Sequence, residues 1–424
     1  MLMVAMSSKS PIRIHAAIPV MDELEYLPSF LENVARQTYR SFHLWACVNQ
    51  PDEWWHDPER RAVCERNQRC LKLLREERGF LVRVIDRSSP GTGWPPKRGG
   101  VGWARKTVMD AICDEADKDA LIVSMDADTA YEAGYFRSLL DSFDEFPDAA
   151  GIAVPYFHHL TKDTSVNRAI LRYEIYLRYY VLNLFRARSP YAFTALGSAI
   201  ALPVKAYRAV GGLKPRQAGE DFYLLQKLCK YGRLLKWNML KVYPSARPSD
   251  RVPFGTGIAV AKGREGDMSG YPIFDCDLFD DIADTYALFP VLFDRDVETP
   301  MSGFLSKLFR TNDIWGPLRR NYTDREHFIR ACHERVDGLR ILQYLKARQA
   351  LMGGSDGERL VRYLRRFHFN SLGRKENAGE DKMIAETLLH DETAEFDLDH
   401  VGIQTLDAIR CFLSTKEDEC RINR

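Results

Sequence analysis

Short apolar runs alternate with amphipathic stretches of helix length over the first half of the chain. Apolar and β-branched residues dominate the runs at 12–20, 42–50, 80–86 and 120–128. The intervening stretches place apolar residues at helical spacing, at 27–37, 58–78 and 101–116. This alternation is typical of βαβ units, so the pattern predicts an α/β fold with a mostly parallel sheet flanked by helices.

The pattern changes along the second half of the chain. It first predicts further strands at 151–159, 194–203 and 234–244 and helices at 132–143, 173–186 and 219–232. The Arg- and Pro-rich segment 245–257 breaks all periodicity and predicts a loop. From about residue 280 only helical spacing occurs, at 302–310, 325–352, 357–369 and 402–414. We therefore expect an α/β catalytic domain over 11–270 and a helical C-terminal region over 271–424.

Charge, hydropathy and cysteine content exclude several classes of protein. Lys and Arg total 60 against 59 Asp and Glu, so no net field attracts nucleic acid, and we expect no nucleic-acid partner. Because no run of about 18 apolar residues is free of charge, we expect no transmembrane segment. The nine cysteines include no C-x-x-C pair, which favours reduced thiols and a cytoplasmic location. The aromatic stretch 173–188 leaves peripheral binding at the inner face of a membrane open.

Two acids follow the fourth predicted strand. Asp126 and Asp128, in the sequence MDAD, are two residues apart, so in a strand their side chains would share a face. The carboxyl ends of parallel strands are where ligands bind, and carboxylates together with substrate phosphates hold Mg²⁺ or Mn²⁺. The pair therefore predicts a Mn²⁺ or Mg²⁺ site, with two solvated acids in a turn as the alternative.

Four motifs in a fixed order carry a resemblance to a known family. IHAAIPVMDE opens the sheet, MDAD closes its fourth strand, GSAIAL follows, and GEDF precedes a helix. This order resembles the family-2 glycosyltransferases of the GT-A fold, over roughly residues 11–257. The resemblance implies a metal-dependent, inverting hexosyltransferase-like enzyme that moves a sugar from a UDP-, GDP- or dTDP-sugar to a hydroxyl acceptor. The acceptor class, whether a glycan, a lipid or a small molecule, stays open.

The resemblance also implies a role for each residue of these motifs. Beside the nucleotide sugar it places Pro19, Val20, Glu23, Arg105 and Ala127, with Asp126 at the ribose or the metal and Asp128 on the metal. Beneath the sugar it places Gly197 and Ser198, with Glu220 facing the acceptor and Asp221 as the catalytic base.

The sequence departs from the family where the second predicted strand ends. Many members have V-D-D-G-S there, whereas this chain has VNQPDEWW, so Asn49, or alternatively Asp52, takes the base-contacting position. The Q-x-x-R-W signature is absent, which predicts a non-processive enzyme, and Arg247 and Arg251 become candidate contacts to the diphosphate or acceptor. In the glycine-rich loop before residue 101, Lys97 is a candidate phosphate contact, with a solvated surface loop as the alternative.

Two other functions compete with glycosyl transfer. A nucleotidyltransferase that makes sugar nucleotides would use the metal acids but would leave GEDF without a role. An inactive GT-A-like scaffold whose helical region binds a partner would not need the acids at all. A homodimer is compatible with every one of these functions.

Overall fold

The structure is a computed structural model that describes residues 14–216, 218–251, 255–369 and 396–422. The chain divides into two compact units, each treated by itself below. The sheet unit comprises 1–159, 195–245 and 252–255, and the helical unit comprises 160–194, 246–251 and 256–424. These units are defined by contacts, and the expected catalytic domain over 11–270 stays a prediction.

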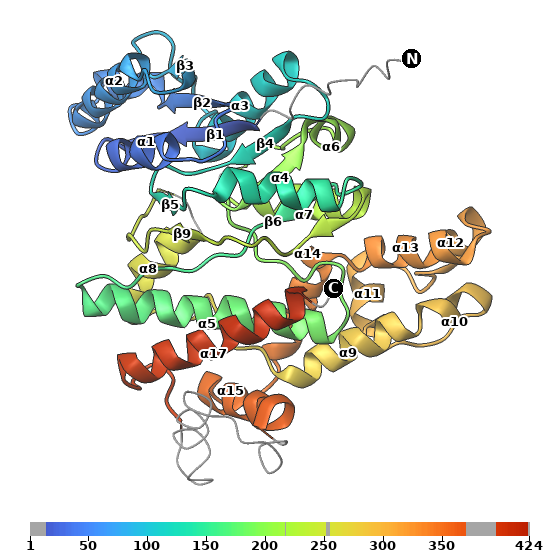
Figure 1. Cartoon of the computed structure of the whole chain (residues 1–424). Coiled ribbons are helices and arrows are strands. Elements are labelled where there is room, and N and C mark those ends of the chain that lie inside the picture. The colour runs from blue at the N-terminus through green and yellow to red at the C-terminus, as the bar shows by residue number, and fades with distance from the viewer. Residues whose placement is uncertain (1–13, 217, 252–254, 370–395, 423–424) are drawn as a thin grey trace, which may run out of the picture. The chain divides into compact units, whose positions relative to one another are not determined.

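The sheet unit is built on a seven-stranded sheet in the order β3-β2-β1-β4-β7-β6-β8 (Figure 1). The neighbours β3, β2, β1 and β4 run parallel, β7 is antiparallel to β4 and β6, and β8 is parallel to β6. The strand bounds are β1 Ile14–Val20, β2 Phe42–Asn49, β3 Leu81–Arg87, β4 Leu121–Ser124, β6 Gly151–Ala153, β7 Ile200–Pro203 and β8 Leu234–Leu235. The prediction of an α/β fold with a mostly parallel sheet is confirmed.

The sheet unit also contains a separate sheet of two strands. Its strands, β5 (Thr129–Tyr131) and β9 (Val242–Pro244), pair antiparallel. Because β5 begins directly after the acids of MDAD, this pairing anchors the far end of the acidic turn. The backbone N–H of Ser245 adds a bond of 3.1 Å to the carbonyl of Asp128.

Helices cover the main sheet, and its inner strands β1, β2 and β4 are buried along almost their whole length. Strand β1 is buried except at Pro19, as expected for a parallel strand covered on both faces. Helix α3 (Val101–Glu115) packs on β1 and β2, with Ala104, Val108 and Ile112 buried at i, i+4 spacing. The other helical elements of this unit are α1 Leu27–Ala35, η1 Asp52–His56, α2 Arg61–Glu76, α4 Tyr135–Glu145, α6 Val204–Ala209 and α7 Glu220–Tyr231.

The helical unit is organised around α5 (Thr164–Arg186), which begins at the N-cap Asp163. Figure 1 shows α17 (Ile403–Ile422) alongside α5, and α8 (Thr256–Arg264) packs on it as well. The remaining helical elements described are α9 Cys276–Ala287, α10 Phe289–Asp294, α11 Ser302–Phe309, α12 Gly316–Asn321, α13 Arg325–Arg335, α14 Gly338–Gln349, α15 Asp356–Leu364 and η2 Arg365–Phe369. No helix of the described residues is long and apolar enough to cross a membrane.

Several predicted elements are shorter or more divided in the structure. The strand expected at 151–159 is only β6, and that expected at 194–203 is only β7. The stretch 325–352, which has continuous helical spacing, forms two helices because Asp337 caps α14, its Oδ1 accepting from Arg340 N–H at 3.2 Å. The loop expected at 245–257 gives way to α8 at Thr256, while 252–254 lie outside the described residues.

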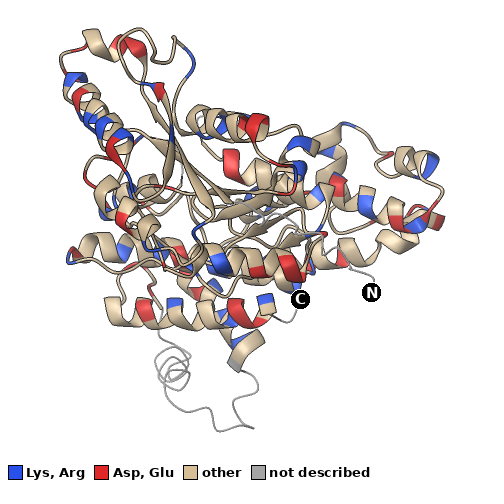
Figure 2. Cartoon of the chain, turned by 45° about the horizontal axis from the view of Figure 1, so that its top comes forward, with Lys and Arg blue, Asp and Glu red and all other residues tan. Residues whose placement is uncertain are grey.

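Acidic and basic residues are interspersed along the ribbon of both units (Figure 2). This distribution agrees with the near-equal counts of the two charges, 60 and 59. A cluster of charges that takes part in catalysis must therefore be local, and the buried charged groups are the candidates for it.

Candidate active site

The acids of MDAD lie in a turn and not in a strand. Strand β4 ends at Ser124, and the N–H of Thr129 bonds the carbonyl of Asp126 at 3.2 Å before β5 begins. The expectation that Asp126 and Asp128 share the face of a strand is therefore wrong in its geometry. The pairing of β4 with its antiparallel partner β7 extends no further along β4 than Ser124. This residue lies opposite Ile200, the first residue of β7.

A buried tyrosine holds this turn to the next motif. The Tyr131 hydroxyl accepts the N–H of Asp126 at 3.1 Å and donates to the carbonyl of Ser198 at 3.2 Å. Burial raises the pKa of Tyr131 well above its ordinary value, so the hydroxyl keeps its proton. Tyr131 therefore connects two predicted site segments that are distant in sequence, although nothing in the sequence pattern singled it out.

A buried arginine gathers the other predicted site residues. The Arg105 side chain, on α3, is 2% exposed and bonds four acceptors. Its Nη1 donates to Ser124 Oγ at 2.5 Å and to the Gly197 carbonyl at 2.9 Å. Its Nη2 donates to Asp126 Oδ1 at 2.9 Å, and its Nε to Glu220 Oε1 at 3.4 Å. The structure thus brings Arg105, Asp126, Gly197 and Glu220 together.

The carboxylates of the GED motif begin helix α7. Gly219 precedes the helix with a φ of 74°, in the left-handed region that glycine adopts without strain. Glu220 is 4% exposed, whereas Asp221 is half-buried. The backbone N–H of Phe222 donates to Asp221 Oδ1 at 2.7 Å, which fixes the orientation of that carboxylate.

Both carboxylates of the GED motif have raised pKa values. Burial, reinforced by the charge of Asp221, raises the pKa of Glu220 to about 7 although Arg105 opposes the shift. Burial also raises the pKa of Asp221, against the N–H of Phe222 and the charge of Arg105. Carboxyl groups with raised pKa values are typical of sites that transfer protons.

The nucleotide-binding candidates lie where β1 and β2 end. Asn49 is 1% exposed; its amide donates to the carbonyl of Val20 at 3.0 Å and accepts from Trp94 Nε1 at 3.0 Å. Glu23 is buried, and its carbonyl accepts the N–H groups of Tyr26 and Leu27 where α1 begins. Pro19, one residue from Val20, is half-exposed.

These bonds give Asn49 a structural task, since it ties β1 to the glycine-rich loop. The alternative, Asp52, is half-exposed, and its Oδ1 accepts the N–H groups of Gly91 and Gly93 at 2.8 and 3.2 Å. A ligand would find a more accessible carboxylate at Asp52 than an amide at Asn49.

The remaining predicted contacts are basic and more exposed. Lys97 is exposed in the glycine-rich loop and has a φ of 70°. Arg247 is half-buried and Arg251 is exposed; both belong to the helical unit, whereas the cluster around Arg105 lies wholly in the sheet unit. Their roles as contacts to the diphosphate or the acceptor stay predictions.

Two carboxylates of the turn suit a hard divalent cation. Asp126 is 30% exposed at its side chain and uses Oδ1 for Arg105, while Asp128 is half-buried. Mg²⁺ and Mn²⁺ take one or two protein carboxylates and complete their coordination with phosphate oxygens and water, so this donor set fits the predicted ion. Ala127 is buried between them and offers only its backbone.

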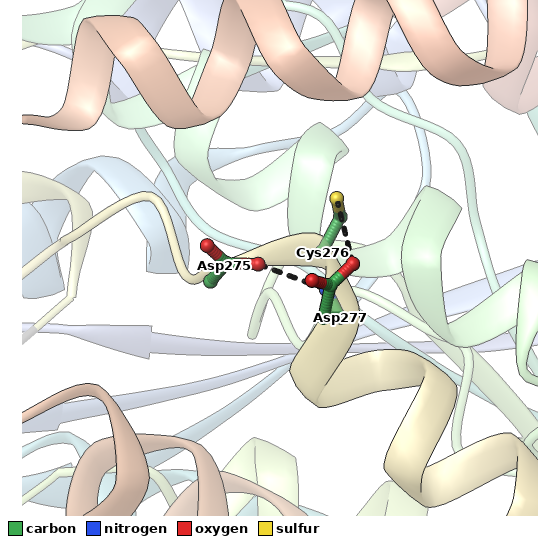
Figure 3. Close-up of side chains that lie close together, drawn as sticks. All are labelled: Asp275, Cys276 and Asp277. Carbon is green, nitrogen blue, oxygen red and sulfur yellow. Dashed lines mark hydrogen bonds between the residues drawn. The ribbon is translucent and has the colours of Figure 1, made fainter. Parts of the chain in front are cut away.

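A second acidic cluster in the helical unit resembles a metal site only in its residue types. Asp275, Cys276 and Asp277 are consecutive at the start of α9, and their ligand atoms lie within 4.8 Å of one another (Figure 3). Asp275 caps the helix by accepting the N–H of Asp277 at 3.0 Å. Arg362 pairs with both carboxylates and Arg366 with Asp277, so arginines already neutralise the cluster.

Residues 121–271 match the family model described as glycosyl transferase family group 2. This segment contains the acidic turn, Gly197 and the GED motif, and the match confirms the resemblance drawn from those motifs. Over that segment the chain is similar to glycosyltransferases of this group.

The chain is also similar to solved structures of glycosyltransferases. Residues 1–349 of TarS from S. aureus, in complex with UDP-GlcNAc, share 10% identity, cover 80% of this chain and 93% of their own, and give a TM-score of 0.40. The mannosyltransferase PcManGT from Pyrobaculum calidifontis, in complex with GDP-Man and Mn²⁺, shares 12% identity over 97% of this chain and 88% of its own, with a TM-score of 0.34. No curated protein matches the chain.

Proposed function

We propose that the protein transfers a sugar from a nucleotide-diphosphate donor to a hydroxyl acceptor with inversion. The segment that matches glycosyl transferase family group 2 contains the acids of MDAD and of the GED motif, and this supports the proposal. The observation that supports this function most directly is the set of bonds from Arg105 to Asp126, Gly197 and Glu220. These bonds place a predicted metal carboxylate and a carboxylate of raised pKa around one guanidinium.

Asp126 and Asp128 would hold Mn²⁺ or Mg²⁺. When bound, such an ion acts as a Lewis acid that stabilises negative charge on the departing diphosphate. Asp126 keeps a partly exposed carboxylate for this purpose even though Arg105 occupies one of its oxygens. Pro19, Val20 and Asp52 are the candidates for the nucleoside, and Gly197 and Ser198 for the sugar.

Asp221 is the better candidate for the base, because Glu220 is committed to Arg105. A base must reach the acceptor hydroxyl, and Asp221 is the more exposed of the two carboxylates. As the acceptor oxygen bonds to the anomeric carbon, its proton passes to Asp221 and the bond to the diphosphate breaks. Glu220 then maintains the turn and the local charge.

The cysteines bear on the cellular compartment, and the missing signature bears on processivity. All nine cysteines, which lie within the described residues, are free thiols, and this supports a reducing compartment such as the cytoplasm. We expect one transfer per acceptor binding event, since the signature of processive members is absent from the sequence.

A donor screen tests the proposal. The protein is incubated with UDP-, GDP- and dTDP-sugars and Mn²⁺, and released nucleotide is measured by mass spectrometry with Asp221→Asn as the control. Nucleotide release that depends on Asp221 supports glycosyl transfer. Pyrophosphate release from a nucleoside triphosphate and a sugar 1-phosphate would instead identify a nucleotidyltransferase, and nucleotide binding without turnover would identify a scaffold.

A further inference from the structure

Arg105 is enclosed so completely that its role is best understood from its neighbours. Four of its five N–H groups are used by protein acceptors, and 2% of its side chain is exposed. Burial alone would lower the pKa of Arg105, but the charges of Asp126, Glu220 and Asp221 together raise it, so the guanidinium stays charged. A nucleotide would find almost no surface of this side chain to contact.

Gly197 touches the guanidinium more closely than any side chain would allow. A Cβ added at this position would lie 2.4 Å from Arg105 Nη2 and 2.9 Å from Cζ. Its φ is not positive, so the backbone itself would accept alanine. Space, and not backbone conformation, therefore requires glycine here.

We propose that Arg105 is the positioning residue of the active site and that residue 197 is glycine in order to admit its guanidinium. The fork fixes Asp126 in the acidic turn relative to the GED motif, through bonds of 2.9 and 3.4 Å. Its Nη1 bonds also hold the end of β4 and the Gly197 carbonyl in place. The packing of Arg105 on Gly197 stands independently of the reaction, whereas the positioning role rests on the proposed function.

This proposal separates two explanations of the same glycine. If Gly197 leaves room for the donor sugar, alanine there harms binding whatever residue stands at position 105. If it leaves room for Arg105, alanine is harmful only while the guanidinium is present. A double-mutant cycle measures this difference directly.

The first experiment measures unfolding by urea for the wild type, Gly197→Ala, Arg105→Met and the double variant. Overpacking of this kind should lower the folding equilibrium constant of the wild type by roughly tenfold or more. In the Arg105→Met background the same alanine should cost less than about threefold, because the guanidinium is gone. Gly303→Ala, at an exposed glycine with open space around it, is the control and should cost nothing.

Equal costs of Gly197→Ala in both backgrounds would overturn the packing role. If Arg105→Met does not fold, the cycle is repeated on Arg105→Lys, whose ammonium lacks the forked group that Gly197 touches. These measurements need no substrate, so they remain informative even if the donor screen finds no transfer.

The second experiment measures kcat and the KM for the donor in Arg105→Lys. A lysine keeps the charge but not the fork, so displacement of the acids by about 1 Å should lower kcat roughly 10²-fold. The KM for the donor should change less than about threefold, since Arg105 does not contact it. Arg36→Lys, at an arginine that is 72% exposed, is the control. A near-normal kcat, or a loss confined to KM, would overturn the positioning role.

Discussion

Each unit of this protein contains buried arginines and buried acids, and the two groups differ in the ratio of those charges. In the helical unit, Glu174 accepts from Arg178 and Arg410 at 2.9 Å each. Glu417 accepts from Arg178 at 2.7 Å and from Arg421 at 2.5 Å. Each of these two buried glutamates thus has two arginine partners, and the pairs join α5 to α17.

In the sheet unit a single arginine serves several acids. Arg105 bonds Asp126 and Glu220, with Asp221 beside them. The excess of acid is visible in the pKa values. Burial and Asp221 raise that of Glu220 to about 7, whereas Arg421 and Arg178 overcome the burial of Glu417 and lower its pKa. Acids matched by arginines stay ionised and hold the fold, while unmatched acids are left to bind a cation or a proton.

The largest effect is expected when the predicted Mn²⁺ or Mg²⁺ is removed from the acids around Arg105. The acid-rich cluster needs positive charge that the chain does not supply, so EDTA should abolish transfer and Mn²⁺ or Mg²⁺ should restore it. Asp128→Asn should weaken nucleotide-sugar binding as well as turnover. Transfer rates with and without EDTA provide the measurement, and full activity in EDTA would contradict the metal role of Asp128.

Loss of the base should have the next largest effect. Asp221→Asn should lower kcat by roughly 10²- to 10⁴-fold while the fold and nucleotide binding persist. Glu220→Gln is the matched comparison and should alter the stability of the turn more than the chemical step. If Glu220→Gln is inactive and Asp221→Asn turns over normally, the two roles are reversed.

In the cluster of Glu174, Glu417 and their arginines, the expected effect is a loss of stability. Glu417→Gln leaves Arg178 and Arg421 short of a buried partner, which should cost about 3–5 kcal/mol of unfolding free energy. Glu419→Gln, on the same helix and half-exposed, should stay within about 0.5 kcal/mol. Urea unfolding of both variants gives the comparison, and equal stabilities would show that the Glu417 pair is dispensable.

The two clusters should also respond oppositely to pH, measured as unfolding free energy in EDTA. Glu220 has a pKa raised from 4.5 to about 7, so its protonated form stabilises the fold below pH 4.5 and that contribution disappears as pH rises through 7. The slope should reach about 1.4 kcal/mol per pH unit at most. Glu417 has a lowered pKa, so its contribution is present above its ordinary pKa and is lost as pH falls.

Glutamine variants assign each limb of that pH curve. Glu220→Gln should reduce the decline between pH 4.5 and 7 to the part that Asp221, whose pKa is also raised, contributes, and Glu417→Gln should remove only the loss at the acid end. An undiminished decline in Glu220→Gln would mean that Glu220 does not titrate in this range.

The sequence predicted the acids, and the family resemblance placed Arg105 beside the nucleotide, but neither predicted that Arg105 bonds the acids. Asp126 could be predicted because it follows an apolar run, and Gly197 and Glu220 because their motifs resemble those of the family-2 glycosyltransferases. Arg105 bonds them across sequence separations of 21, 115 and 92 residues, and no local pattern reports such distances. Ser124 did leave a signal, as the only polar residue within the buried strand β4.

Strand lengths were harder to predict for a related reason. The runs at 151–159 and 194–203 are apolar because they are buried, and β6 and β7 occupy only part of each. Burial alone does not reveal where hydrogen-bonded pairing stops. At the N-terminus of α7 the helix dipole favours an ionised Asp221, but burial outweighs the dipole and raises the pKa of Asp221.

The smallest effect is expected at the acids that most resemble a metal site by composition. Asp277 is 49% exposed and pairs with Arg362 and Arg366, so its charge is already balanced. Asp277→Asn should therefore leave the Mn²⁺ concentration for half-maximal activity unchanged within about twofold, since pairs exposed to this extent contribute little. Activity titrated with Mn²⁺ in this variant and in Asp128→Asn distinguishes the acids at the start of α9 from those of the acidic turn. A large shift at Asp277 and none at Asp128 would mean that acids matched by arginines bind the cation, and the ratio of charges would no longer distinguish the two regions.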